Sequence, residues 1–296
     1  MKKIAVINDL SGLGKCSLTA ALPVISVMGV QACPFPTAIL SAQTGFGTYF
    51  YEDYTKHMDS MMESWKQLGF CPDGIYTGFL SGASQADKVL DFIRIFEREE
   101  VKILTDPIMG DNGAEYPIYS KKLCEKMRLL AKKASVITPN LTEALLLLYG
   151  KEEMHIRWKQ LAGLSRKEYM EAVETIGRSL VETYGAEAAI TGIDLEAEGE
   201  KTMDEMANLL VNSNGCFWIS AKKEGGSYSG TGDLFASVLS AGMVKGIPTE
   251  VSVKKAVGFL SKAIRDTVAE GTDRNQGVCF EKYLRELTEQ SGASPF

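Results

Sequence analysis

The chain has 296 residues, of which 45% are hydrophobic and 24% are charged, a composition typical of a globular protein with a large core. Its formal net charge is -6, which argues against nucleic acid or an anionic membrane surface as a partner. No apolar run approaches the roughly 18–20 residues that a membrane-spanning helix needs.

Short apolar runs alternate with longer helical patterns along the chain. The expected strands are Lys3–Asn8, Gly74–Thr77, Lys102–Asp106, Ser135–Thr138 and Glu187–Thr191. The expected helices are Leu18–Met28, Ser84–Glu99, Ser120–Lys133, Thr142–Leu148 and Arg166–Tyr184, with a further helical pattern after Asp233. This alternation predicts an α/β fold in which a mostly parallel sheet lies between two layers of helices. With no repeat or linker to divide the chain, residues 1–296 are expected to form one domain.

Two segments interrupt the alternation. Residues 33–56 are rich in Pro, Thr, Gly and aromatic residues and could form a small flap over the sheet edge. Residues 151–166 form a polar insertion whose shape the sequence does not indicate.

The cysteines and histidines argue against a zinc site. The six cysteines are scattered singly and there are only two histidines. The first apolar run is too short for a signal-peptide core. Scattered single thiols without such a signal indicate a reducing, cytoplasmic compartment.

The segment from Ser229 to Asp233 reads Ser-Gly-Thr-Gly-Asp and leads directly into an apolar helical pattern. The first turn of a helix carries unpaired N–H groups that attract anions, and glycines let a phosphate approach them. A carboxylate there is poorly placed to bind phosphate. It is well placed to take a proton from a hydroxyl that attacks phosphorus, so the pattern indicates phosphoryl transfer.

Two further motifs follow expected strands. Asp106 ends a strand and Asp111 follows it in a glycine-rich turn, which is either a self-satisfied tight turn or a site for a hard cation and phosphate. Asn140 and Glu143 have the spacing of a helix capping box, and they could also hold a metal-bound water or a phosphate oxygen.

A substrate loop is expected near the first strand. Ser11 offers a hydroxyl in Asp-Leu-Ser-Gly-Leu-Gly, and we prefer this reading to a simple turn, which explains the segment nearly as well. The glycine spacing fails as a dinucleotide fingerprint. Two Thr-Gly-Phe pieces begin at Thr44 and Thr77, and their phenylalanines could stack on a flat ring or lie in the core. The chain has neither a P-loop nor the protein-kinase motifs.

Together these motifs resemble the ribokinase-like superfamily, and within it the pyridoxal/pyridoxamine (vitamin B6) kinases. The resemblance rests on Gly-Thr-Gly-Asp, on Asp-Pro-x-Met-Gly-Asp-x-Gly, on Thr-Pro-Asn-x-x-Glu-Ala and on the segments after Asn8 and Pro36. It covers about residues 3–245. It implies ATP-dependent phosphorylation of the 5′-hydroxymethyl group of pyridoxal, pyridoxamine or pyridoxine, with Mg²⁺, a monovalent cation such as K⁺, and a homodimer.

The resemblance also implies a role for each matching residue. Asp233 matches the catalytic base, and Gly230, Thr231 and Gly232 match the anion hole. Asp106, Asp111, Asn140 and Glu143 match positions that organise magnesium and the ATP phosphates. Thr138 and Thr191 match positions near phosphate and the monovalent cation. Ser11, Thr44 and Phe79 match positions around the pyridine ring.

Three alternatives stay open. Hydroxymethylpyrimidine kinases share the Asp-x-Ser-Gly start but resemble Gly-Thr-Gly-Cys in the late motif, so Asp233 favours the pyridoxal type. Gln43 replaces a histidine and Phe79 a tyrosine of the pyridoxal kinases, which leaves the preferred vitamer open. A non-catalytic nucleotide- or vitamer-binding relative would have no use for Asp233. A sugar kinase would need more carboxamides and acids near Asp9.

Overall fold

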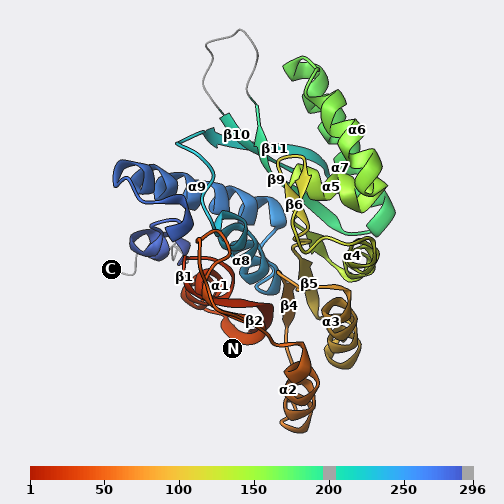
Figure 1. Ribbon diagram of the computed structural model, residues 1–296, viewed down its shortest axis with the longest axis vertical. Helices are drawn as coiled ribbons and strands as arrows, with labels where there is room; N and C mark the ends of the chain where they lie inside the picture. Colours follow the sequence, from red (N-terminus) through yellow and green to blue (C-terminus); the bar gives the residue numbers. More distant parts are fainter. Residues whose placement is uncertain (196–204, 289–296) are drawn as a thin grey trace, which may run out of the picture.

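The computed structural model describes residues 1–195 and 205–288, and its main feature is one nine-stranded sheet in the order β11-β10-β9-β8-β5-β4-β1-β2-β3 (Figure 1). The strands of this sheet are β1 (Lys3–Leu13), β2 (Gln31–Ala42), β3 (Tyr51–Asp53), β4 (Gly74–Thr77), β5 (Lys102–Thr105), β8 (Val136–Ile137), β9 (Glu187–Asp194), β10 (Glu205–Asn212) and β11 (Gly215–Lys222). Six adjacent strands, β9, β8, β5, β4, β1 and β2, run parallel to one another. At the two ends of the sheet, β3 is antiparallel to β2, β10 is antiparallel to β9, and β11 is antiparallel to β10. A separate hairpin consists of β6 (Gly110–Asp111) and β7 (Ala114–Glu115).

Helices cover both faces of the sheet, as expected. One face carries α2 (Thr55–Gln67), α3 (Ala83–Phe96), α4 (Lys121–Lys133), α5 (Leu141–Tyr149), α6 (Lys151–Leu161) and α7 (Arg166–Tyr184). The other face carries α1 (Ser17–Val27), α8 (Thr231–Val244) and α9 (Thr249–Ala269), followed by short 3₁₀ turns at Arg274–Gln276 and Glu281–Leu287. Figure 1 shows the two helical layers on opposite sides of the strands.

The side chains of the central strand β1 show why helices must cover both faces of the sheet. Successive side chains of a strand point to opposite faces. Ala5 and Ile7 pack into the core under α2–α7, whereas Ile4 and Val6 pack into the core under α1, α8 and α9. All four side chains are fully buried, so a continuous apolar run is what this doubly covered strand requires.

The segment expected as a flap is instead mostly sheet. Residues 31–42 form β2, which pairs with β1, and Tyr51–Asp53 form β3 on the outer side of β2; only residues 43–50 project beyond the sheet. The prolines at 34 and 36 misled the prediction. They are tolerated because β3 pairs only with Ala38–Leu40, so the prolines lie where β2 has an open edge.

The structure also contains longer and additional elements that the sequence did not predict. β1 continues to Leu13, so Asp9 and Ser11 lie within a strand and not in a loop. The polar insertion forms α6, and α2, α9, β10 and β11 had no counterpart among the expected elements. The fold class itself, a mostly parallel sheet in three layers, is confirmed. Within the described ranges, no helix is both long enough and apolar enough to cross a bilayer.

Candidate active site

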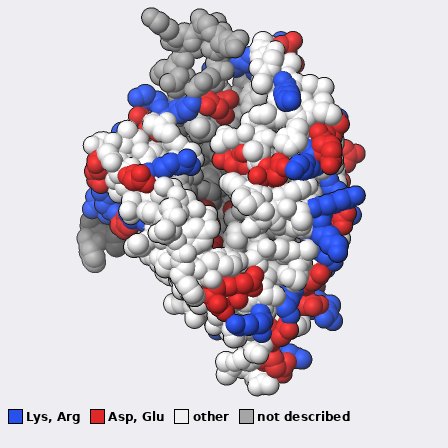
Figure 2. Space-filling view, viewed as in Figure 1, with Lys and Arg blue, Asp and Glu red and all other residues white. Residues whose placement is uncertain are grey.

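The carboxyl ends of the parallel strands meet at one edge of the sheet, where ligands bind in open α/β sheets. Thr77, Asp106 and Thr138 lie at or just beyond these ends, and Asn8 within β1 and Thr191 within β9 lie where the parallel pairing with β4 and β8 ends. An isolated parallel bridge between Asn140 and Thr191 extends the β8–β9 pairing to this edge. A hollow runs down the middle of the face in Figure 2, between the side that carries α8 and α9 and the side that carries α5 and α6.

Asn8 joins three elements at this edge. Its amide nitrogen donates a 3.0 Å hydrogen bond to Oδ1 of Asp233 in the first turn of α8. Its amide oxygen accepts hydrogen bonds from the backbone N–H groups of Phe79 (2.8 Å) and Asp9 (3.0 Å). Asn8 is fully buried and Gly78 packs directly on its amide, where a Cβ would collide. The side chain is therefore held in one orientation.

The carboxylate of Asp233 is buried, with 9% of the residue exposed. Burial raises its pKa to about 6, and the nearby charge of Asp9 adds to this rise, whereas hydrogen bonding by the Ser17 amide and by Asn8 lowers it. At neutral pH the group is ionised, yet its pKa is close to that of an efficient general base.

The turn before Asp233 requires glycine. Gly230 caps α8 with φ of 82°, in the left-handed region, and a Cβ there would collide with the carbonyl oxygen of Lys15. Gly232 faces Asp106: a Cβ at position 232 would lie 4.0 Å from Oδ2 of Asp106. The helix N-terminus, its two glycines and both carboxylates therefore share one small space, with Thr231 between the glycines.

Asp106 follows β5 beside several buried hydroxyls. Burial and the charge of Asp233 raise the pKa of Asp106, and the proximity of Thr138 lowers it. In the described part of the chain, the buried hydroxyls of Tyr76, Thr77, Thr105 and Thr138, near the carboxyl ends of β4, β5 and β8, have no partner at hydrogen-bond geometry, and a further one, that of Ser252, lies in α9. Buried polar groups are normally paired, so the hydroxyls at the strand ends have capacity for a ligand or ion at this edge.

The Asn140–Glu143 capping box is present. Oδ1 of Asn140 accepts from the Glu143 amide (3.0 Å), and Oε2 of Glu143 accepts from the Asn140 amide (2.9 Å). Oε1 of Glu143 accepts from the backbone N–H of Met109 (3.1 Å), and burial raises the pKa of Glu143 well above its usual range. Glu143 thus links the segment after Asp106 to α5. It supports the structure of the site in addition to placing a carboxyl group there.

The β6–β7 hairpin carries Asp111. The side chain of Asn140 donates to the carbonyl of Gly110 (2.8 Å), and the amide of Gly113 donates to Oγ1 of Thr142 (2.8 Å). Asp111 is partly buried, which raises the pKa of its carboxyl, while the charge of Arg274 lowers it. The hairpin therefore holds a second carboxylate near the edge.

The three residues expected around the acceptor lie in different settings. Phe79 is half-buried beside Asn8. Ser11 is buried and donates to Oδ2 of Asp9 (2.8 Å), which also accepts at Oδ1 from Ser17 (2.5 Å). Thr44 is exposed on the 43–50 turn. The structure therefore joins Phe79 to Asn8 and Ser11 to Asp9, while no hydrogen bond in the described part of the chain ties the Thr44 side chain to them.

No three His, Cys, Asp or Glu side chains among residues 1–195 and 205–288 form a group able to hold a metal ion by themselves. Magnesium does not require such a group, because it commonly binds through one or two carboxylates together with substrate phosphates and water. Asp106 and Asp111 are a donor set of this kind.

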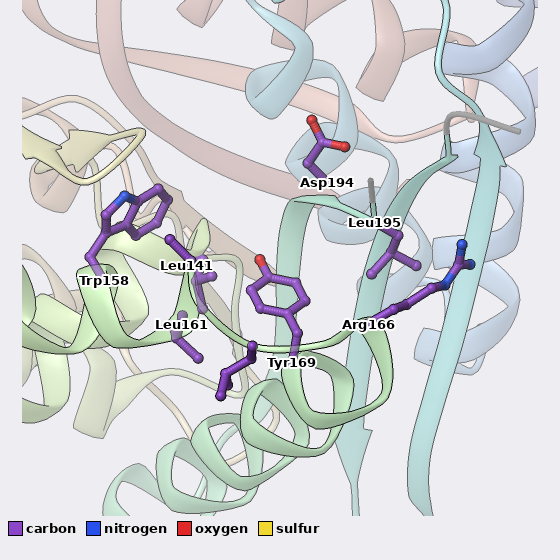
Figure 3. Close-up of a pocket in the computed structure, with 9 residues that line it drawn as sticks. Leu141, Trp158, Leu161, Arg166, Tyr169, Asp194 and Leu195 are labelled. Carbon is purple, nitrogen blue, oxygen red and sulfur yellow. The ribbon is translucent and has the colours of Figure 1, made fainter. Parts of the chain in front are cut away.

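A separate cavity of about 330 Å³ is lined by residues of α5, α6 and α7 and of the end of β9 (Figure 3). In the close-up the rings of Trp158 and Tyr169 flank it, and Asp194 lies at its rim. Arg166, which also lines the cavity, is paired with Glu205. None of the residues expected at the site lines this cavity.

Sequence reasoning missed two groups. Asn8 was visible only as a polar residue that ends the buried Ile4–Ile7 run, a signal sufficient to place it at the edge but not to orient it on Asp233. Arg274 follows α9, for which no element was expected, and nothing in its local sequence indicates the site.

Comparisons with known proteins show the family of this chain. A model of the phosphomethylpyrimidine kinase family matches residues 14–278. Among curated proteins, the hydroxymethylpyrimidine/phosphomethylpyrimidine kinase of Staphylococcus aureus is 24% identical over 69% of this chain, which spans 66% of that protein. Pyridoxal kinase PdxY of Leifsonia xyli is 22% identical, with 99% of each chain covered.

Solved structures are similar over nearly the whole chain. A Bacteroides thetaiotaomicron protein named as a phosphomethylpyrimidine kinase, crystallised with pyridoxal, has a TM-score of 0.85 and 33% identity, covering 97% of this chain and 95% of that one. Pyridoxal kinase from Lactobacillus plantarum has a TM-score of 0.82 and 25% identity, covering 97% and 96%.

Proposed function

Because the chain belongs to the phosphomethylpyrimidine kinase family of ribokinase-like proteins, we propose that it is a kinase that transfers the γ-phosphoryl group of ATP to the hydroxymethyl group of a B6 vitamer. The observation that carries this proposal is the buried carboxylate of Asp233 in the first turn of α8, directly after the glycine turn.

In the proposed reaction, Asp233 takes the proton of the acceptor hydroxyl. A bond forms between that oxygen and the γ-phosphorus, while the bond from phosphorus to the bridging oxygen breaks and its electron pair leaves on ADP. The backbone amides of Gly230, Thr231 and Gly232 hold the transferring group. Positioning and charge neutralisation supply most of the acceleration in such transfers.

The residues at the edge fit nucleotide phosphates and Mg²⁺. Asp106 and Asp111 would hold the metal, and the unpartnered hydroxyls of Thr105 and Thr138 supply further oxygen donors. Asn140 and Glu143 would act by holding the Asp111 hairpin and the segment after Asp106 in place. Thr191, bridged to Asn140, completes this side, where a monovalent cation such as K⁺ would bind. Bound magnesium supplies neutralisation of the phosphate charge.

Two observations support a pyridine acceptor. The Bacteroides relative, 33% identical, was crystallised with pyridoxal. In this chain the backbone N–H of Phe79 is bonded to Asn8 and the residue is half-buried. An aromatic side chain at this position would suit a flat ring, and Ser11 and Thr44 would contribute at its rim.

Hydroxymethylpyrimidine is the second candidate acceptor, because the family model and the Staphylococcus aureus relative carry that name. It too is a flat ring with a hydroxymethyl group. The carboxylate at position 233 favours the pyridoxal type.

One assay separates these possibilities. ADP release is measured with purified protein, ATP and Mg²⁺ against pyridoxal, pyridoxamine, pyridoxine, hydroxymethylpyrimidine and ribose. We expect the highest kcat/KM with a B6 vitamer. Higher kcat/KM with hydroxymethylpyrimidine would reassign the acceptor, with ribose would make the chain a sugar kinase, and no release with any acceptor would indicate a non-catalytic binder.

The proposed assembly is a homodimer through the β1–β2–β3 side of the sheet. Exposed apolar side chains gather in sequence at the ends of these strands, at Leu10, Leu13, Tyr49, Phe50 and Tyr51. Exposed apolar patches of this kind mark interaction surfaces. Light scattering of the protein and of Phe50→Asp tests it, with a monomer expected for the variant. The proposed compartment is the cytoplasm, since all six cysteines are unpaired.

A further inference from the structure

The segment that follows α9 crosses the mouth of the candidate site and contacts three of its loops. The carbonyl of Arg274 accepts from the amide of Ser229 (3.1 Å), next to Gly230. The carbonyl of Gln276 accepts from the amide of Lys15 (3.2 Å). Nε2 of Gln43, at the start of the projecting turn, donates to both oxygens of Asn275, each at 3.2 Å.

The segment is also held from within. Oδ1 of Asp273 accepts from the amide of Asn275 (2.8 Å), and its carbonyl accepts from the amide of Gln276 (2.9 Å). Gly277, at φ of 79°, packs against Lys15, where a Cβ would lie 3.0 Å from the Lys15 backbone nitrogen. These contacts fix the backbone of Arg274 beside the glycine turn that precedes Asp233.

Acidic side chains outnumber basic ones around this position. Asp9, Asp106, Glu143 and Asp233 are all buried at the edge, and Asp111 is partly buried there. Lys15, a cation that contacts the same segment, is engaged in an ion pair with Glu281 at 2.9 Å. The Arg274 side chain is exposed and, in the described part of the chain, forms no ion pair. The hydrogen bond that the Arg274 carbonyl accepts from the Ser229 amide places this residue beside the glycine turn.

We propose that the guanidinium group of Arg274 binds the γ-phosphoryl group of the nucleotide, together with the amides of Gly230–Gly232. This inference rests on the proposed function. A planar guanidinium donates paired hydrogen bonds to phosphate oxygens and keeps its proton throughout, so it adds charge stabilisation without taking part in proton transfer. It supplies the positive charge that a site lined with carboxylates needs when a phosphate enters.

The test compares Arg274→Gln, Arg274→Lys and the control Arg265→Gln, which removes an exposed arginine from α9. Binding is measured by calorimetry, without acceptor, for ADP and for the non-hydrolysable imido analogue of ATP. We expect Arg274→Gln to lose about 10–100-fold in affinity for the ATP analogue and little for ADP. Arg274→Lys recovers part of the loss, the control behaves as wild type, and kcat follows the affinity for the analogue.

Three results would overturn the assignment. One is wild-type affinity for the analogue and wild-type kcat in Arg274→Gln. The second is an equal loss for ADP and the analogue, which would place the contact elsewhere on the nucleotide. The third is a loss that Arg274→Lys does not reduce, accompanied by a lower Tm in both variants, which would make the role structural. If the wild-type protein transfers phosphate to no acceptor, the proposed function fails, and the two binding measurements still decide the role of Arg274.

Discussion

The side-chain amide of Asn8 donates a 3.0 Å hydrogen bond to the carboxylate of Asp233, across 225 positions of sequence. Both groups are buried, and the other end of the Asn8 amide is fixed by the backbone of β1 and of the segment after β4. The central strand β1 therefore orients Asp233, the proton acceptor of the proposed reaction, through Asn8.

Asn8→Ala should remove the hydrogen bond that orients the Asp233 carboxylate. Because the hydrogen bond from Asn8 lowers the pKa of Asp233, its loss raises that pKa and moves the acid limb of the kcat/KM profile to higher pH. We expect kcat to fall about tenfold, the equivalent of one lost buried hydrogen bond. When Asp233→Asn is already present, Asn8→Ala should lower kcat little further. If the two losses in kcat instead add up in the double variant, Asn8 acts independently of Asp233.

Asp233→Asn should abolish most of the turnover while leaving nucleotide affinity unchanged. A general base contributes about 10²–10⁴-fold, and the variant should lose that factor in kcat. In the wild type, kcat/KM should fall about tenfold for each pH unit below a pKa of about 6. Near-normal turnover in the variant would remove Asp233 from the proton transfer.

The same substitution should stabilise the protein at neutral pH. The pKa of Asp233 is raised by folding from 3.8 to about 6, so the free energy of unfolding is greatest below pH 3.8 and falls as the pH rises toward 6. Above that pH the wild type has lost up to about 3 kcal/mol, which Asp233→Asn does not lose. Denaturant melts at pH 4 and pH 7 check this. We expect the variant to be more stable only at pH 7, and equal stability there would contradict the burial effect.

Gly230→Ala should damage both fold and function, because position 230 has φ of 82° and its Cβ would meet the Lys15 carbonyl. A strained backbone of this kind costs on the order of 1–3 kcal/mol before any clash is counted. Gly226 provides the matched control: a Cβ there meets nothing within 4 Å and its φ is not in the left-handed region. Gly226→Ala should retain wild-type Tm and kcat. Equal behaviour of the two variants would show that the turn tolerates side chains.

The features that the sequence predicted correctly are those encoded by a pattern within one segment. The buried run of β1, the capping box at Asn140 and the glycines before Asp233 are local signals, and each occurs in the structure where it was expected. The β2 strand was missed because its prolines act against a strand everywhere except at an open edge, and only the arrangement of the sheet shows that β3 leaves the edge beside the prolines open. The Asn8–Asp233 contact and the position of Arg274 depend on how distant segments meet, which no local pattern encodes.

The tie between Gln43 and Asn275 has a consequence for how this molecule is made. The mouth of the candidate site is built from β1, from the turn after β2 and from the segment after α9, so 232 positions separate two side chains that must touch. During synthesis the early strands emerge long before their late partners, and contacts of such large sequence separation form slowly. Catalytic competence should therefore be among the last properties a nascent chain acquires, appearing only after the region beyond α9 has left the ribosome.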